Sequence, residues 1–459
     1  MTNQKNNAAQ KLRISISLLA VFLLAGCSIT PTYQRPEVNT LAWKEGAPSQ
    51  NSEIAADWWK GFGSGELNAL MQRALAHNNN LQASLQRIEQ ARAGLQIAGA
   101  SLLPSASAAA ESMKISEISG SREKDEPSLA ANAGISYELD LFGANRAGTE
   151  AAREMLLSTQ YAHDALALVI MGDVAQNYFN VLNLKERHRI AQENLKSTQD
   201  LLEVVKARFQ AGARTALEIA QQETVLSNAQ AEVAALEQEL ALAQNALAIL
   251  VGEPPQAFSV ADGNLNGINI PPMAALQPSA LLERRPDIQS AEAELIAANA
   301  DIGAARAAFF PSVTIGTNLL LAANPSSAAL ALASSLYAPI FQGGRLEGNV
   351  NRVTARQKEL AENYQQTVLV AFRESEDALT KVKTTQKREG ALAQAAKKAR
   401  EAYDMAKNQY SLSVIDFQSV LDSQRLMLES KDRYARARFE TLSARIDLFK
   451  AMGGGWNRK

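Results

Sequence analysis

The residue types that usually carry catalysis or metal binding are few and scattered in this 459-residue chain. The three histidines, His77, His163 and His188, are far apart in the sequence and have no partner cysteine at a metal-ligand spacing. No nucleophile elbow or phosphate loop occurs, because "QGGR" (342–345) is typical of a strand-to-helix turn and "GGGWN" (453–457) lies at the chain terminus. We therefore expect no catalytic residues, no metal site and no cofactor.

The single cysteine, Cys27, is a candidate for lipid attachment. Lys5, Lys11 and Arg13 precede a short apolar run, so residues 1–26 are predicted to be a signal peptide. "LAGC" (24–27) resembles the lipobox of bacterial lipoproteins, which implies cleavage before Cys27 and a covalent lipid on its sulfur. The alternative is an ordinary signal peptide followed by an incidental buried thiol. Ser28 stands where an inner-membrane retention signal has Asp, so the resemblance implies sorting to the outer membrane.

Charge and hydropathy limit the partners of the mature chain. Removing Lys5, Lys11 and Arg13 takes the net charge from −2 to −5, and no basic stripe remains, so nucleic acid is not an expected partner. A lone cysteine also excludes an intramolecular disulfide framework. No apolar run of helix-spanning length follows Cys27, so a membrane crossing has to be made of strands.

An internal duplication organises the rest of the chain. "NNNLQASLQRIEQARAGLQIAGASLLPS" (78–105) aligns with "RPDIQSAEAELIAANADIGAARAAFFPS" (285–312), and later segments align at an offset of about 201. A polar insertion at 117–127 accounts for the change of offset and marks an exposed loop. We predict these parts in order: a lipid-anchored segment 27–66, a first repeat 67–252, a linker 253–275, a second repeat 276–453 and a tail 454–459.

Each repeat is expected to contain a long helical hairpin, over 150–252 and 345–452. No proline interrupts these stretches, and apolar or small residues recur at spacings of three and four, as in coiled coils. The expected seams are Leu195, Thr198, Leu202, Val205 and Phe209 in the first repeat, and Ala396, Ala399, Tyr403, Ala406 and Tyr410 in the second. The turns contain Gly212 and Ser413. Thr215 with Glu218 predicts a capping box after the first turn, and Asp416 predicts an N-cap after the second.

Four strands are expected, at about 104–116, 128–142, 311–321 and 329–341. From Leu129 to Leu141 the odd positions are apolar and the even positions mostly polar, as in transmembrane barrel strands. The alternative is a pair of soluble hairpins with one face packed on a core. An open sheet edge cannot lie in lipid, so four strands per chain have to close by self-association. Two copies give a barrel filled by side chains, whereas three give twelve strands and a lumen.

Several motifs carry a family resemblance over nearly the whole chain. They are "GCSITPTYQRP" (26–36), "DWWKGFGSGELNALMQRAL" (57–75), "LLERRPDIQSAEAELIAANADIGAARAAFFPS" (281–312), "VLDSQR" (420–425) and "LFKAMGGGWN" (448–457). The chain resembles the outer-membrane efflux lipoproteins, the TolC-like channels of tripartite pumps. The resemblance implies a mainly α fold with a small transmembrane β part: a homotrimer whose 12-stranded β-barrel in outer-membrane lipid continues as an α-helical barrel through the periplasm.

The resemblance also implies partners and a gate. The partners are a periplasmic adaptor protein and an inner-membrane transporter of the RND type, and the exported solutes are drugs or other small toxic molecules. Asp422 matches a pore-facing acid at the narrowest ring, where three carboxylates would attract cations; the alternative is an ordinary acid on an exposed helix surface. Asp416 is a second gate candidate, although its N-cap position explains it; Arg214 and Arg425 could pair with these acids or simply be solvated. Gly212 and Ser413 are the candidate adaptor contacts, and Ser413 stands where the family often has Gly.

Other interpretations explain less of the sequence. A structural or adhesive coiled-coil lipoprotein without transport accounts for the seams and the anchor but not for the strands. A periplasmic adaptor would need lipoyl and soluble β domains. Trp58 and Trp59 are expected to be packing anchors, and Arg285 with Asp287 is expected to stabilise a helix start rather than to act in catalysis.

Overall fold

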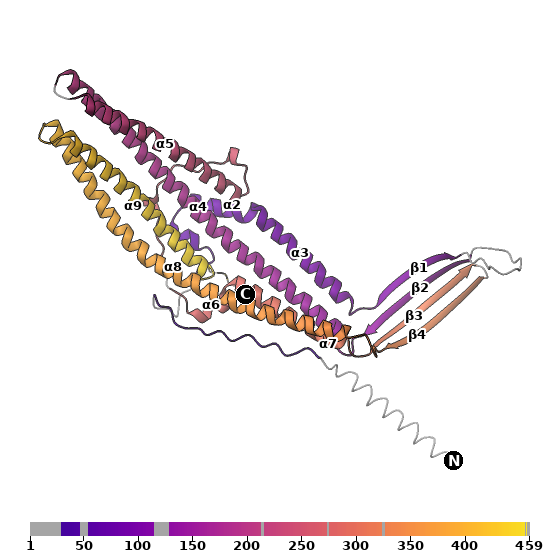
Figure 1. Cartoon of the computed structure of the whole chain (residues 1–459). Coiled ribbons are helices and arrows are strands. Elements are labelled where there is room, and N and C mark those ends of the chain that lie inside the picture. The colour runs from indigo at the N-terminus through magenta and orange to yellow at the C-terminus, as the bar shows by residue number, and fades with distance from the viewer. Residues whose placement is uncertain are drawn as a thin grey trace, which may run out of the picture. The chain divides into compact units, whose positions relative to one another are not determined.

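The computed structural model describes residues 29–45, 54–113, 128–212, 215–272, 275–323, 326–454 and 456 (Figure 1). The predicted signal peptide, Cys27, the 117–127 insertion and Arg214 lie outside the described residues. The segment 27–66 contains η1 (Trp58–Phe62). The elements of the first repeat are α2 (Gly65–His77), which starts just before it, α3 (Asn79–Ala100), β1 (Ser105–Met113), β2 (Ser128–Leu139), α4 (Ala144–Gln210) and α5 (Ala216–Leu250). The linker holds η2 (Pro255–Ala257) and η3 (Leu265–Gly267), and the second repeat comprises α6 (Pro278–Arg284), α7 (Pro286–Ala307), β3 (Ser312–Ala323), β4 (Ser326–Tyr337), α8 (Arg345–Ser411) and α9 (Phe417–Ala451).

The two helical hairpins have matching lengths. Helices α4 and α8 have 67 residues each, about 100 Å at 1.5 Å per residue, and helices α5 and α9 have 35 each. Helix α4 begins at Ala144 rather than near residue 150. The side chain of Asp140 accepts hydrogen bonds from the backbone N–H groups of Asn145 (3.1 Å) and Arg146 (2.9 Å), which satisfies donors of the first turn and allows the earlier start.

The described chain divides into two compact units that do not coincide with the sequence repeats. We call the first the sheet unit; it is built from parts of Met1–Glu37, Gln86–Gln160 and Ser290–Gln366. The second, the hairpin unit, is built from parts of Val38–Leu85, Tyr161–Gln289 and Thr367–Lys459. Both repeats contribute to both units, so neither repeat folds as a separate domain.

The four strands form one antiparallel sheet in the order β1-β2-β3-β4 (Figure 1). Ala133 on β2 pairs with Ala108 on β1 and with Leu319 on β3, and Leu319 pairs with Leu330 on β4. This register places most of the large apolar residues of β2, β3 and β4 on one face and residues such as Asn132, Asn318 and Ser335 on the other, where Leu320 is an exception. The predicted alternation is confirmed.

The apolar face of the sheet is exposed. Ile135 is 53 % exposed, Leu336 70 % and Leu332 86 %. The described chain therefore offers no core for this face, and the alternative of two soluble hairpins packed on a core is wrong. An exposed apolar surface of this kind requires lipid or a partner to cover it.

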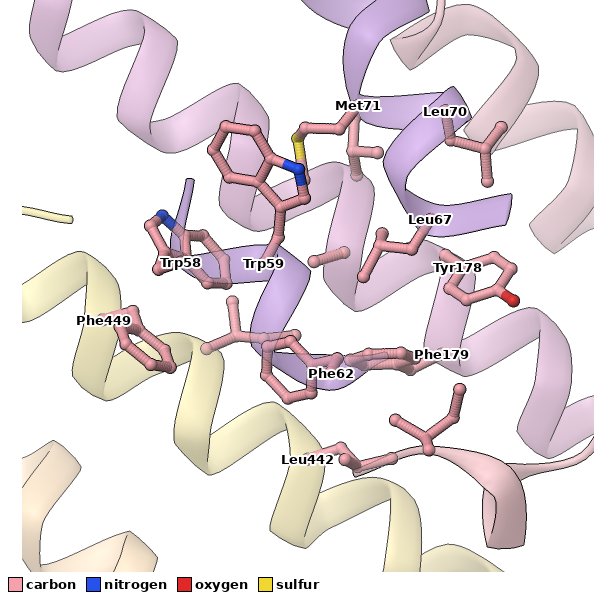
Figure 2. Packing of buried hydrophobic residues seen from close by; sticks show 14 of the residues in the cluster. Trp58, Trp59, Phe62, Leu67, Leu70, Met71, Tyr178, Phe179, Leu442 and Phe449 are labelled. Carbon is pink, nitrogen blue, oxygen red and sulfur yellow. The ribbon is translucent and has the colours of Figure 1, made fainter. Parts of the chain in front are cut away.

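The core of the hairpin unit is built around aromatic residues near the start of the described chain (Figure 2). Trp58 stacks on Phe449 with ring centroids 4.9 Å apart, and Phe62 meets Phe179 edge to face at 5.0 Å. Trp58, Trp59 and Phe62 are all buried. The expectation that the tryptophans are packing anchors is confirmed.

The expected coiled-coil seams are only partly correct. All five residues of the second seam are buried, from Ala396 to Tyr410. In the first seam Phe209 is 42 % exposed, so its assignment is wrong. The guanidinium of Arg208 lies 4.4 Å from the ring centre of Tyr410 and so covers this end of the seam from α4.

The capping box after the first turn is also wrong. Thr215 has the extended backbone of an N-cap, and its carbonyl accepts from the N–H of Glu218 at 3.2 Å, but its side chain makes no capping hydrogen bond. Asp416, by contrast, accepts from the backbone N–H of Ser419 at 2.8 Å. The second hairpin therefore has the stronger helix start.

One described helix contains a stretch apolar enough by length and composition to cross a membrane, although no such run was expected after Cys27. It is an 18-residue window within α4, and half of that window is buried inside the chain. A helix packed in the core of a protein passes the same test of length and composition, so this window alone does not identify a membrane span.

Two equivalent glycines end the shorter helices of the hairpins. Gly252 follows α5 with φ +77°, and Gly453 follows α9 with φ +83°. A β-carbon on Gly252 would lie 2.4 Å from the carbonyl oxygen of His77, and one on Gly453 would lie 2.8 Å from that of Arg284. Each glycine thus allows the end of one helix to approach the end of a preceding one, α2 or α6.

We expect Gly252→Ala to lower the free energy of unfolding by about 2–4 kcal/mol, because it adds a left-handed alanine and a clash with backbone. Gly212→Ala is the matched control, since Gly212 has φ +71° but nothing within 4 Å of its β-carbon position; it should cost about 1 kcal/mol. Denaturant unfolding of the detergent-solubilised protein, followed by circular dichroism, measures both. Equal losses in the two variants would rule out the crowding.

Candidate functional site

The turns of the two helical hairpins have the same backbone conformation. Gly212 has φ +71° and Ser413 has φ +61°, and Ser413 is the one non-glycine residue with a positive φ in the described ranges. In both turns the backbone N–H of this residue donates a 2.9 Å hydrogen bond to the carbonyl oxygen three residues before it. Serine at this position therefore keeps the glycine-type turn and bears the strain of a left-handed backbone.

We expect Ser413→Gly to raise the free energy of unfolding of the second hairpin by about 1 kcal/mol, because glycine adopts this backbone without steric cost. Ser411→Gly is the control, since Ser411 is the last residue of α8 and glycine lowers helix stability there by about 0.5 kcal/mol. Amide hydrogen exchange of the turn peptides measures both changes. A loss of protection in Ser413→Gly would contradict the assignment of strain.

The gate candidate Asp416 has a structural role that is visible in the structure. Its carboxylate caps α9, and hydrogen bonds from the side chain and the backbone of Ser419 lower the pKa of this carboxyl. Asp416 is therefore a fixed negative charge at the start of α9, next to the turn.

Asp422 lies on the second turn of α9 and is half-exposed. It accepts hydrogen bonds from Gln418 (3.2 Å) and from Arg425 (3.3 Å) of the same helix. The Arg425 side chain is 81 % exposed, so the structure shows a solvated pair within one helix rather than a pair across hairpins. Asp422 and Arg425 also line a groove of about 710 Å³ bordered by residues of α4, α5 and α9.

Beneath this groove lies a buried polar cluster that was not predicted from the sequence. The side-chain amide of Gln424 on α9 donates to Asn194 and Thr198 of α4, both at 3.0 Å, and Gln222 on α5 donates to the carbonyl of Thr198 at 2.9 Å. Gln222, Gln424 and Thr198 are buried. The cluster ties the first hairpin to α9, and neither glutamine stands out in the sequence, because each has polar neighbours on both sides.

The segment that follows the predicted lipidation site lies along α7 in the sheet unit. Arg35 contacts both carboxylate oxygens of Glu292, at 2.6 and 2.7 Å, and Tyr33 donates to the same carboxylate at 3.3 Å. Burial, together with Glu292, raises the pKa of Tyr33. Asn299 donates to the carbonyl of Pro31 at 2.7 Å.

Thr30, near the start of the described chain, packs so closely on α7 that only a glycine fits at position 303. A β-carbon on Gly303 would lie 2.0 Å from the hydroxyl oxygen of Thr30. Thr30 is three residues after Cys27, a span of at most about 11 Å in an extended chain. The contacts thus hold the chain on α7 immediately after the proposed site of lipid attachment.

The remaining motifs have structural roles. Arg285 is 7 % exposed and binds Asp287 (2.7 Å), Glu374 (2.8 Å) and the carbonyl of Ala451 (3.2 Å), which is the expected network at a helix start. His163 shares a 2.6 Å hydrogen bond with Ser84. Among the described residues no group of three His, Cys, Asp or Glu side chains is placed to hold a metal ion.

Comparisons with known proteins agree with this geometry. The model of the family "Outer membrane efflux protein" matches residues 70–253 and 277–454. The chain is 36 % identical to the pyoverdine export outer membrane protein OpmQ of Pseudomonas aeruginosa, over 96 % of this chain and 97 % of that protein. It is 30 % identical to the cation efflux system protein CusC of Escherichia coli, over 95 % and 97 %.

Solved structures give the same result. The crystal structure of the open state of the Neisseria gonorrhoeae MtrE outer membrane channel superimposes with a TM-score of 0.83 at 28 % identity, covering 94 % of this chain and 98 % of that one. A crystal structure of CusC matches with a TM-score of 0.83 at 27 % identity, covering 93 % of this chain and 100 % of that one.

Proposed function

The chain belongs to the outer membrane efflux protein family, and on that basis we propose that three copies form the passive exit duct of a tripartite efflux pump. The protein is an outer-membrane efflux channel that extends into the periplasm. The observation that carries the proposal is the four-stranded sheet, whose apolar face is exposed and whose outer strands β1 and β4 each pair with only one described neighbour.

The unpaired edges support self-association. Backbone donors and acceptors along β1 and β4 have no water to bind in lipid, so each edge has to pair with another copy. Two copies would give eight strands, a barrel filled by its own side chains, whereas three give twelve and leave a water-filled lumen. The small and polar residues on the other face, such as Gly134, Ser136 and Gly316, suit the wall of such a lumen.

We propose that Cys27 carries the lipid that anchors each copy. The lipobox resemblance supports this, and so do the contacts of Thr30, Pro31 and Arg35 with α7, since they fix the chain close to the anchor. Lipid chains anchor a protein but do not span the membrane, so the anchor and the sheet have different roles.

The closed gate is proposed to lie at the hairpin turns, with Asp422 at the narrowest ring. Asp422 lies on α9 six residues after the cap Asp416, close to the turn in sequence, and its carboxylate is half-exposed. Three such carboxylates would attract cations and repel anions. Arg425 and Arg214 would adjust the charge of the same region.

The turns themselves, Gly212 and Ser413, are the proposed contacts for a periplasmic adaptor, which would connect the channel to an inner-membrane transporter of the RND type. Relatives of similar identity are named for pyoverdine export, cation efflux and toluene efflux. One channel fold with such different cargo supports a passive duct in which the transporter selects the solute.

The decisive test is chemical cross-linking in native envelopes combined with planar-bilayer recording of the purified protein. We expect a cross-linked species of three chains and a cation-selective conductance. Monomers alone after cross-linking, or no pore activity in any gate variant, would refute the proposal.

A further inference from the structure

A basic cavity lies in the hairpin unit, between α4, α8 and α9, and has no role in the duct proposed above. Its volume is about 310 Å³, and η3 of the linker contributes Leu265 and Asn266 to its wall. The size is at the lower end of the range found for small-molecule pockets. The cavity is therefore large enough for a small organic molecule but not for a folded partner.

The charged groups of this wall are mostly positive. Five cationic side chains line the cavity against one carboxylate, Glu186; they are Arg189, Lys397, Arg400, Lys431 and Arg438. Arg189 is paired with Glu186 and Glu193, Arg400 with Asp404 at 2.9 Å, and Arg438 with Glu389 at 3.0 Å. Three of the cations thus have carboxylate partners at hydrogen-bond distance.

The other two cations are incompletely neutralised. Lys431 is about three-quarters buried, and the carboxylate oxygen that pairs with it, on Glu193, is 3.9 Å away. Lys397 makes no ion pair with the described residues. The Nε of Arg438 is also buried and has no hydrogen-bond partner among the described residues. Burial, and after it repulsion from Arg400, lowers the pKa of the Lys431 amine. No carboxylate is close enough to offset this loss of solvation.

Apart from Asn266, the rest of the wall is apolar or aromatic. It is formed by Ile190, Leu265, Ala393, Ala396 and Ala435, with the ring of Tyr434 beside them. We propose that the cavity binds a small organic anion, with a phosphate or carboxylate group between Lys431 and Arg438 and an apolar or aromatic body against α4 and η3. A charge-assisted hydrogen bond from the Lys431 amine to the anion would supply the close partner that Glu193, at 3.9 Å, does not.

Pyridoxal 5′-phosphate is a suitable probe, because it combines a phosphate, an aromatic ring and an aldehyde that reacts with lysine. The amine of Lys431 attacks the aldehyde carbon, a C–N bond forms, the aldehyde oxygen leaves as water, and borohydride then delivers hydride to the imine carbon. Peptide mass spectrometry of the full-length protein in native outer membranes measures the labelling rate of each lysine.

We expect labelling of Lys431 to saturate with reagent concentration and to be at least about tenfold faster with pyridoxal 5′-phosphate than with pyridoxal, the equivalent of one charge-assisted hydrogen bond. Phenyl phosphate should protect Lys431. Lys407 on α8, which is exposed and has no ion pair among the described residues, is the control lysine and should show no preference and no protection.

Two results would overturn the proposal. Equal rates with the two reagents at Lys431 would show that its reactivity comes from its amine alone. Labelling that occurs only after detergent extraction would show that another protein or another copy fills the cavity. Arg438→Met provides a second test, since it keeps the reactive lysine and should abolish the tenfold preference, whereas Lys407→Met should leave it unchanged.

Discussion

Asp422→Ala is expected to open the resting channel and to reduce its cation selectivity. The substitution shortens the side chain at the proposed constriction and removes the contacts with Gln418 and Arg425. Both contacts lie within one helix and are the same in the closed and open states, so the effect has to come from the loss of the side chain and its charge at the ring. A loss of roughly 1 kcal/mol over the three copies would shift the equilibrium about fivefold toward the open state. Single-channel recording in a planar bilayer measures the open probability, and ion gradients measure the selectivity.

Glu401→Ala is the matched control for this prediction. Glu401 forms an i, i+3 pair with Lys398 on α8, and its side chain is 44 % exposed, close to the 52 % of Asp422. Both variants lose one exposed acid, but only one of them changes the proposed ring. An unchanged open probability and selectivity in Asp422→Ala, or the same change in both variants, would place the gate elsewhere.

Leu332→Arg is expected to prevent stable insertion of the sheet into the outer membrane. Leu332 lies in the middle of β4 on the apolar face and is 86 % exposed. An arginine on the lipid face of a barrel strand costs about 2–4 kcal/mol at the bilayer midplane, and an assembly of three copies carries this cost three times. The measurement is the amount of assembled, urea-resistant protein in the outer-membrane fraction.

Ala333→Arg, one residue along, is the control. Ala333 pairs with Gly316 and lies on the opposite face, with the polar residues. If that face lines an aqueous lumen, the arginine stays hydrated and assembly should be close to that of the unsubstituted protein. Equal loss of assembly in the two variants would contradict the assignment of the faces.

The strands were predictable because their signal is local. Alternation along each strand decides which of its residues share a face. The register itself, which pairs Ala133 with Leu319 and Leu319 with Leu330, was not predicted. The hairpins were predictable for a similar reason, since an unbroken run of helix formers followed by a turn residue needs no distant contact.

Features that depend on packing between distant segments were not predictable. Phe209 and Tyr410 occupy equivalent positions in the two repeats, yet only Tyr410 is buried, because Arg208 lies over its ring. Thr215 matches a capping sequence but makes no capping bond. The cluster of Gln222 and Gln424 with Thr198 joins residues more than 200 positions apart, and the division into sheet unit and hairpin unit cuts across both repeats.

The candidate site was partly accessible from sequence. Asp416 could be recognised as a cap because its partner is three residues away, whereas the pairing of Asp422 with Arg425 depends on side-chain directions that the sequence does not specify. The basic cavity could not be predicted at all, because its cations come from α4, α8 and α9.

The two hairpin turns share a backbone but differ in chemistry. The first reads "QAGAR" and carries a positive charge, whereas the second reads "SLSVI" and carries none. Around a threefold axis the six turns would alternate, so that the rim has pseudo-sixfold geometry but only threefold chemistry. A docking ring of six identical subunits would then make two inequivalent kinds of contact with the turns, whereas a ring of three could contact one kind of turn only. The chemistry of the turns would therefore determine how many partner subunits bind.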